Sequence, residues 1–357
     1  MYKNTLVTGG AGFAGSALCI ALKKRFPEME VTALDNLKRR GSELNLPRLK
    51  TAGVKFVHGD IRELSDLTGL QPAPDLIIEC SAEPSAQAGY GGSPDYLIRT
   101  NLTGCYHCLE LARLAKADFI FLSTSRVYPY RVLNDIAWEE NGSRFTVAAN
   151  QSLPGISEHG VSEEFPLEGP RSLYGMTKLA AELMVEEYAD AYGMRFIINR
   201  FGLLTGPYQM AKSDQGVVAL WMAAHYFARP LGYIGFGGTG KQVRDFLHVD
   251  DFCELVLDQV ANFSLYAGGR FNAGGGVENS VSLSELTQLC EETSGKTIPM
   301  RSVAENRPAD VRIYLTDNRR VMGVNGWRPR LGAGRVLGDI HEWLRGDEAR
   351  LGLLMFG

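Results

Sequence analysis

The chain has 357 residues, of which 45% are hydrophobic and 22% charged, and its formal net charge is -4. This length suits one large α/β domain or two fused ones, and the acidic balance excludes a basic nucleic-acid surface. No apolar run reaches the ~20 residues that a membrane helix needs. Residues 1–8 lead directly into a strand pattern without a signal segment, so we expect a cytoplasmic protein with no membrane partner.

Strand and helix patterns alternate through the first 200 residues. Strands are predicted over residues 5–8, 30–35, 54–57, 75–80, 119–123 and 195–199. Helices are predicted over residues 13–26, 102–115 and 174–192. The last helix is expected to turn Glu182, Glu186 and Glu187 toward solvent. This alternation predicts an α/β fold with a Rossmann-type, doubly wound parallel sheet in residues 1–200.

Two later regions depart from this alternation. Residues 129–171 are rich in Pro, Gly, Asn and Ser, and they indicate a long insertion that we interpret as a wall over the ligand. Beyond residue 205 the pattern fades, so residues 201–357 are expected to form mainly a smaller α/β substrate-binding domain. Within it, Ser282 stands three residues before Glu285, the spacing of a capping box at a helix start.

Six cysteines are present, and Cys105 and Cys108 form a C-x-x-C inside a predicted helix. No second pair of metal ligands lies nearby in the sequence. We therefore predict buried, unpaired thiols and no metal site.

A glycine-rich turn joins the first strand to the first helix. Its spacing permits a tight turn and lets a pyrophosphate approach the helix N-terminus. Twenty residues after Gly15, a carboxylate ends the second strand, where it would hold a ribose diol and favour NAD over NADP, although basic residues 38–40 follow it. The residues predicted to contact the cofactor here are Gly9, Gly12, Phe13, Ala14, Gly15, Asp35 and Asn36.

Polar residues also follow the third and fifth strands. Asp60 and Ile61 would lie at the adenine, with a helix N-cap as the alternative role for Asp60. Ser123 and Thr124 end the fifth strand, where one hydroxyl could orient proton transfer, or could simply belong to a strand-end turn.

Tyr174 and Lys178 stand four residues apart in the last helix of this region and therefore share a helix face. A free tyrosine has a pKa of about 10, and a fixed ammonium nearby lowers it toward neutral pH. The pair would make Tyr174 a general base, although helices also carry such pairs by chance.

The glycine turn, the Ser/Thr strand end and Tyr174-x-x-x-Lys178 together resemble the extended short-chain dehydrogenase/reductase family, which mostly modifies nucleotide sugars. The resemblance covers almost the whole chain. It implies a catalytic triad of Thr124, Tyr174 and Lys178. It also implies bound NAD, with Ala82 and Ser123 near the cofactor, and it implies that some chain segments after residue 200 belong to the cofactor domain. It also implies a homodimer formed by helices matching residues 99–115 and 174–192.

A narrower likeness, to CDP-paratose 2-epimerases, rests on residues 35–41 with 56–62, the insertion, Ser213-Asp214-Gln215-Gly216 and residues 238–251. It implies a nucleotide diphosphate sugar as substrate. The guanidinium groups of Arg244 and Arg307 suit a diphosphate, and the alternative role of these arginines is a structural ion pair. The residues implied for substrate binding are Glu83, Ser125, Arg126, Gln215, Gln242, Arg244 and Arg307.

The chain departs from the family pattern at two places. Its fourth strand ends in Glu79-Cys80-Ser81-Ala82-Glu83-Pro84 where a His-x-Ala-Ala run is usual, which leaves the substrate open. Leu203 replaces an Asn of galactose epimerases, which disfavours UDP-galactose.

The resemblance also narrows the reaction. Dehydratases of the family place an Asp-Glu pair after the Thr, where this chain has Ser125 and Arg126. 3,5-Epimerases use a Cys/Lys pair, and no Cys lies near residues 124–128. Simple epimerisation through a transient keto-sugar is therefore predicted, at C2 with C4 as the alternative. A dehydratase, a reductase and a silent NAD-binding protein stay as further alternatives.

Overall fold

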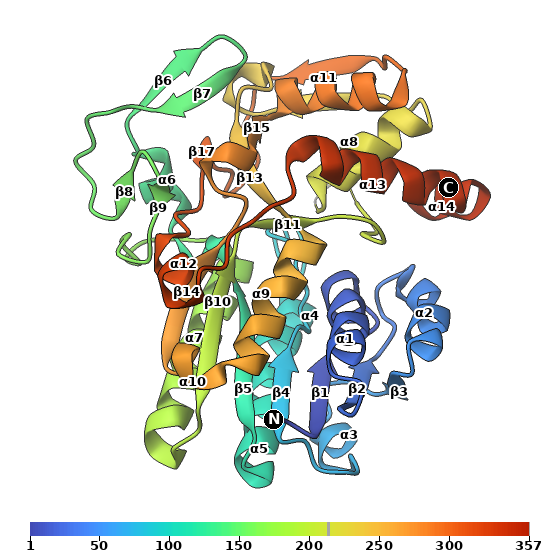
Figure 1. Cartoon of the computed structure of the whole chain (residues 1–357). Helices are drawn as coiled ribbons and strands as arrows, with labels where there is room; N and C mark the ends of the chain where they lie inside the picture. Colours follow the sequence, from blue (N-terminus) through green and yellow to red (C-terminus); the bar gives the residue numbers. More distant parts are fainter. Residues whose placement is uncertain (213–214, 357) are drawn as a thin grey trace. The chain divides into compact units, whose positions relative to one another are not determined.

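The computed structural model describes residues 1–212 and 215–356, and its chain divides into two compact units (Figure 1). The first unit comprises Met1–Val127, Leu173–Arg200 and Phe252–Phe271. The second unit comprises Tyr128–Ser172, Phe201–Asp251 and Asn272–Gly357. Segment 128–172, predicted as an insertion, thus clusters with the later part of the chain, whereas segment 252–271 clusters with the N-terminal part.

A seven-stranded sheet forms the centre of the first unit, in the order β14-β10-β5-β4-β1-β2-β3. Its strands are β1 (Asn4–Thr8), β2 (Glu30–Asp35), β3 (Lys55–His58), β4 (Leu76–Glu79), β5 (Asp118–Thr124), β10 (Phe196–Phe201) and β14 (Gly269–Ala273). β1 pairs in parallel with both β2 and β4, so the strand order reverses direction at β1. In such sheets the ligand crevice opens at the carboxyl ends of the strands beside this reversal.

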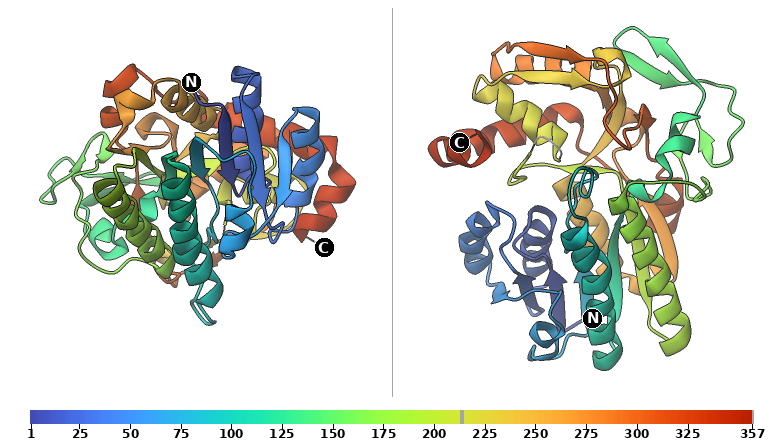
Figure 2. Two further views of the ribbon diagram at one scale, coloured as in Figure 1. Left: turned by 90° about the horizontal axis from the view of Figure 1, so that it is seen from below. Right: turned by 180° about the vertical axis from the view of Figure 1, so that it is seen from behind.

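Helices cover both faces of this sheet. They are α1 (Phe13–Arg25), α2 (Leu46–Thr51), α3 (Leu64–Thr68), α4 (Asp95–Ile98), α5 (Gly104–Ala115), α7 (Leu173–Tyr192), α9 (Val249–Ala261) and α10 (Phe263–Tyr266). Figure 1 shows α1 and α9 on one face, and the view from behind in Figure 2 shows α5 and α7 on the other. A π-helical turn, Arg99–Thr103, leads into α5.

The strands form because their sequences are almost continuously apolar, as expected for parallel strands buried on both faces. β4 reads Leu-Ile-Ile-Glu and is buried throughout. Against the sheet, α5 and α7 enclose an apolar core that includes Leu109, Phe119 and Ile198. Cys105 and Cys108 face this core and are unpaired, as the sequence predicted.

The second unit is built around β13 (Val243–His248), which pairs with β11 (Leu203–Thr205), β15 (Ser280–Ser282) and β17 (Ile313–Tyr314). β12 (Leu231–Ile234) pairs with β16 (Met300–Val303). The 128–172 segment contributes α6 (Tyr130–Asn134) and two hairpins, β6 (Trp138–Asn141) with β7 (Arg144–Val147) and β8 (Ile156–Ser157) with β9 (Gly160–Val161). The other helices are α8 (Val217–Tyr226), α11 (Leu283–Ser294), α12 (Arg319–Asn325), α13 (Ala333–Gly346) and α14 (Glu348–Phe356).

The predicted elements of the first 200 residues are present with bounds shifted by at most a few residues, and the doubly wound fold is confirmed. The capping box is also confirmed, because Ser282 caps α11 and exchanges hydrogen bonds with Glu285. Within the described residues, no helix combines the length and apolarity needed to cross a membrane. The same residues contain no cluster of three metal-ligating side chains.

Candidate active site

The glycine turn follows β1 at the strand reversal and begins α1. Gly9 has a positive φ of 63°, and a Cβ added to it would lie 3.0 Å from the backbone of Ser81. A Cβ at Gly15 would lie 2.2 Å from the Gly9 carbonyl oxygen, so the helix can start this close to the turn only with glycine there. Gly12 caps α1 without a side chain, which leaves the helix N-terminus open to a phosphate.

Asp35 ends β2 beside this turn, as predicted. Its carboxylate accepts hydrogen bonds from the Ala11 N–H at 3.1 Å and the Leu37 N–H at 2.8 Å. Burial raises the pKa of Asp35, and these backbone donors oppose the rise. Asp35 therefore braces the glycine turn, and its remaining lone pairs can still accept from a ribose hydroxyl.

Asp60 follows β3 and does not cap a helix, which corrects the alternative role considered from the sequence. α3 is preceded by Glu63, and the Asp60 carboxylate pairs with Arg62 at 2.6 Å. The hydrogen bond from Arg62 lowers the pKa of Asp60 to about 2. Asn36 also donates to Asp60, at 2.9 Å, which ties the ends of β2 and β3 together. The adjoining Ile61 is buried.

α7 carries Tyr174, Lys178 and Glu182 at four-residue intervals, so the three side chains lie on one helix face. All three are buried, with Tyr174 9% exposed and Lys178 3% exposed. α7 packs against β5, and it also packs against Ser125–Val127, the 3₁₀ turn that follows β5 in the chain. The structure thus sets the Tyr-Lys helix face beside the β5 end that carries Thr124.

Lys178 lies in a buried, charged environment that the sequence reasoning did not identify. Its Nζ is 3.6 Å from Oε2 of Glu79 and 3.9 Å from the centroid of the Phe121 ring. Glu79 is the last residue of β4, and Phe121 is its register partner on β5. In the sequence, the only indication of this environment was the Glu79 carboxylate at the end of an otherwise apolar strand.

Glu182 is 1% exposed, so its predicted solvent-facing position is wrong. Arg200 of β10 donates to both of its carboxylate oxygens, the shortest contact being 2.7 Å. The Ser123 hydroxyl donates to the same carboxylate. The Ser123 hydroxyl is therefore engaged by a side chain within the protein. Glu182 stays inside because Arg200 supplies a buried partner charge.

Asn101, in the π-helical turn before α5, is a second residue that the sequence reasoning missed. Its side chain accepts from the Glu83 N–H at 2.8 Å and donates to the Glu83 carbonyl at 3.2 Å. It also donates to the Thr177 hydroxyl of α7 at 3.1 Å. Asn101 therefore fixes the loop containing Ala82 and Glu83 relative to the helix of Tyr174. π-Helical turns are frequent at functional sites, but this turn is visible only in the structure, so the sequence carried no signal for Asn101.

Ser125 and Arg126 are partly buried and lie in the 3₁₀ turn after β5. The Thr124 hydroxyl oxygen accepts from the Arg126 N–H at 3.2 Å, so Thr124 holds this turn. No carboxylate stands at either position after Thr124.

Four predicted substrate residues belong to the second unit. Gln242 immediately precedes β13, Arg244 lies in β13, and Arg307 lies in the loop before β17. Asp310 of that loop accepts from Arg244 at 3.3 Å, so β13 and the loop are joined by an ion pair. Gln215 pairs with Lys212 through backbone hydrogen bonds, and Ser213 and Asp214 lie outside the described residues.

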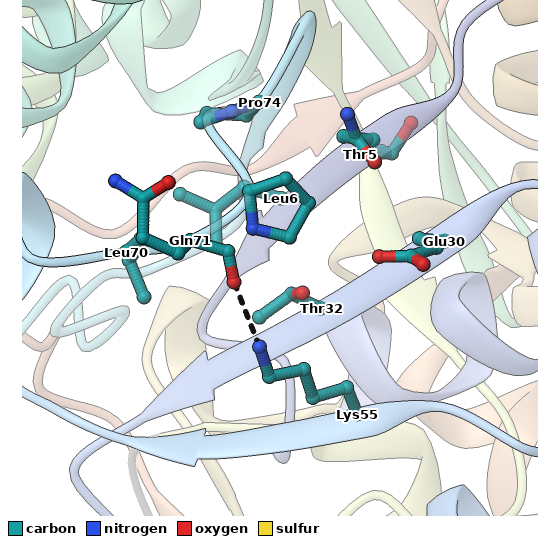
Figure 3. A pocket seen from close by; sticks show the side chains of 10 residues that line it. Thr5, Leu6, Glu30, Thr32, Lys55, Leu70, Gln71 and Pro74 are labelled. Carbon is teal, nitrogen blue, oxygen red and sulfur yellow. Dashed lines mark hydrogen bonds between the residues drawn. The ribbon is translucent and has the colours of Figure 1, made fainter.

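A pocket lies at the amino ends of β1, β2 and β3, and Figure 3 shows Lys55 donating to the Gln71 carbonyl at its wall. Thr5, Glu30 and Thr32 also line it. The glycine turn lies at the carboxyl end of β1, so this pocket is not the predicted cofactor site.

A family model described as the NAD dependent epimerase/dehydratase family matches residues 5–274, which is more than half of the chain. The chain belongs to this family. It is 30% identical over 347 residues to a CDP-paratose 2-epimerase of Salmonella typhi, covering 95% of this chain and 98% of the relative. It is 27% identical to a dTDP-glucose 4,6-dehydratase of Streptomyces niveus, covering 96% and 93% of the two chains.

Among solved structures, the UDP-glucose 4-epimerase of Thermus thermophilus in complex with NAD is similar, with a TM-score of 0.77 and 26% identity. The match covers 96% of this chain and 99% of that one. The family and fold predicted from the sequence are thereby confirmed, as is NAD as the cofactor of this family. The open helix start at Gly12 and the carboxylate of Asp35 fit a dinucleotide.

Proposed function

We propose that this NAD-dependent family member is a nucleotide-sugar epimerase that inverts C2 of a CDP-hexose of the CDP-paratose or CDP-tyvelose type. One observation carries the reaction class: the buried Tyr174-Lys178 face adjoins the end of β5, where Ser125 and Arg126 follow Thr124. The site therefore contains a candidate base for oxidation of the sugar hydroxyl. It lacks the carboxylate pair after the Thr that dehydratases of the family use to eliminate water. Similarity to a CDP-paratose 2-epimerase over almost the whole chain supports the choice of carbon and base.

In this proposal Tyr174 removes the proton from the sugar hydroxyl, and Thr124 donates a hydrogen bond that orients the same oxygen. Lys178, on the same helix face, would hold the cofactor ribose and supply a positive charge that favours proton removal by Tyr174. The cofactor would supply, when bound, the acceptor for the hydride of the sugar carbon and the donor that gives it back. After the keto-sugar has turned over in the site, the Tyr174 hydroxyl would return its proton to the same sugar oxygen.

We assign the cofactor to the first unit. The residues proposed to hold it are Gly9, Gly12, Phe13, Ala14, Gly15, Asp35, Asn36, Asp60, Ile61, Ala82 and Ser123, with Tyr174 and Lys178. Asp60 and Ser123 would act mainly through Asn36 and Glu182, because their side chains bind those partners.

We assign the nucleotide sugar to Glu83, Ser125, Arg126, Gln215, Gln242, Arg244 and Arg307. Gln242 has a specific feature that supports its role. Its Nε2 donates to the Ile234 carbonyl at 3.0 Å, whereas its buried Oε1 has no hydrogen-bond partner among the described residues. A buried acceptor without a partner is costly, and a ligand hydroxyl or amine would satisfy it.

Inversion at C4 is the second candidate, because the similar Thermus protein is a UDP-glucose 4-epimerase. The same Tyr174 chemistry serves either carbon, and the choice depends on how the sugar is held. We also propose a cytoplasmic location, a compartment that keeps the six unpaired thiols reduced.

A panel of CDP-, UDP-, GDP- and dTDP-hexoses, with products followed by NMR in deuterated water, tests the function. We expect one CDP-hexose to invert at C2 without solvent deuterium and without net NADH. Inversion at C4 would select the second candidate. Loss of water or net NADH would contradict an epimerase, and no turnover of any sugar by NAD-loaded protein would favour a silent NAD-binding protein.

A further inference from the structure

Glu79 is a buried carboxylate for which the proposed reaction has no stated use. It ends β4 in register with Thr8 on β1 and with Phe121 on β5, so it lies in the middle of the sheet. Its side chain is 2% exposed. An ionised carboxylate at such a place is unfavourable unless an opposite charge compensates it.

Lys178 supplies that charge. Register partners in parallel strands point to the same face, so Glu79 and Phe121 both face α7. The Lys178 ammonium contacts both, at 3.6 Å from Glu79 Oε2 and 3.9 Å from the Phe121 ring centroid. Within the described part of the chain, Glu79 Oε2 has no hydrogen bond. Burial raises the pKa of Glu79, and the neighbouring Lys178 charge opposes that rise and favours the ionised carboxylate.

The other titratable groups near Glu79 do not replace Lys178. Cys80 follows it on β4, and Cys105 and Cys108 approach from α5. Burial raises the pKa of all three thiols well above the usual value, so they stay neutral. Glu182, one turn beyond Lys178, is bound by Arg200.

We propose that Glu79 is a positioning residue that fixes the Lys178 ammonium and offsets part of its positive charge at Tyr174. This rests on the proposed function, in which Lys178 promotes ionisation of the Tyr174 hydroxyl. A carboxylate behind the ammonium weakens that promotion. Glu79 thus sets the pH range in which Tyr174 can act as a base, while it also keeps the lysine in place.

The test is the Tyr174 titration, followed by NMR of ¹³Cζ-labelled tyrosine in wild type and in Glu79→Gln, with Tyr174→Phe to assign the resonance. Without the carboxylate, the ammonium acts on Tyr174 unopposed, so we expect Tyr174 in Glu79→Gln to titrate about 0.5–1 pH unit lower. The acid limb of the pH–rate profile should move by the same amount. Glu187→Gln, which removes an exposed charge from the same helix, should leave the titration unchanged.

An unchanged Tyr174 titration in folded Glu79→Gln would overturn the proposal. The titration needs no sugar, so a chain that turned over none of the panel would leave this result readable. If Glu79→Gln does not fold, Glu79→Gln/Lys178→Met is compared with it. Restored folding in the double variant supports the pairing, because no lone ammonium then stays buried, and no restoration would contradict it.

Discussion

Among single residues, Tyr174 is the one on which the proposed reaction depends most. The side chain is 9% exposed and stands one helical turn before Lys178. In the proposed reaction Tyr174 acts as the base, and the periodicity of α7 places the Lys178 ammonium on the same helix face.

Replacing Tyr174 by Phe should remove turnover while NAD stays bound. Loss of a positioned acid–base group lowers kcat by about 10²–10⁴-fold, whereas the glycine turn and Asp35 are unchanged. Turnover is measured on the sugar found by the panel, and bound NAD is measured after its release by denaturation. Tyr192→Phe, an exposed tyrosine of the same helix, is the control and should retain activity. Unchanged turnover in Tyr174→Phe would rule out Tyr174 as the base.

The sequence identified residues whose role follows from local spacing, and it failed for residues whose role depends on another strand. The positions of Gly9, Asp35 and the Tyr174-Lys178 pair were predicted correctly because turn chemistry and helix periodicity are local. Glu182 was misplaced because its partner, Arg200, lies on a different strand. Helix patterns treat glutamate as a solvent-facing residue, and only tertiary pairing reverses that preference.

At the scale of elements, α7 links three strands through the charges on its inner face. Lys178 pairs with Glu79 of β4, and Glu182 binds Ser123 of β5 and Arg200 of β10. The helix is therefore held by buried ion pairs as well as by its apolar residues. Strand and helix bounds were predictable because apolar runs and helical spacing are strong signals here, whereas the short hairpins of segment 128–172 carry neither.

Removing Glu182 should destabilise this arrangement. Glu182→Leu leaves the Arg200 guanidinium buried without its carboxylate, which costs about 3–5 kcal/mol of unfolding free energy. All four tryptophans lie in the second unit, so fluorescence does not report on α7. Hydrogen exchange of peptides from β5, α7 and β10 is the suitable measurement.

The matched control for that measurement is Glu187→Gln on the exposed side of α7, for which we expect a change within about 0.5 kcal/mol. Equal protection of these peptides in Glu182→Leu and Glu187→Gln would contradict the role given to the buried pair.

For the molecule as a whole, the family resemblance predicts a homodimer formed through α5 and α7. Leu109 and Leu111 of α5 pack into the core and give no support for it. The outer sides of α5 and α7 instead expose Tyr106, Leu114, Leu183 and Tyr192. α5 and α7 contact each other, so these side chains could form one apolar patch for a second copy.

We predict a dimer of twice the 39.2 kDa chain mass in sedimentation velocity. Leu183→Glu, at a site 56% exposed, should shift it to monomer because a charge would be buried in the interface. Leu265→Glu on α10, at a site 59% exposed, is the control and should stay dimeric. A monomeric wild-type chain at micromolar concentration would contradict the prediction.

In the proposed reaction, the sugar is oxidised transiently at the carbon that becomes inverted. This step is tested most directly with a substrate carrying deuterium at that carbon, converted in ordinary water and analysed by NMR. Return of the same hydride to the other face predicts that the deuterium stays on the inverted carbon of the product. Its replacement by solvent hydrogen would contradict the account and indicate inversion by proton exchange at carbon.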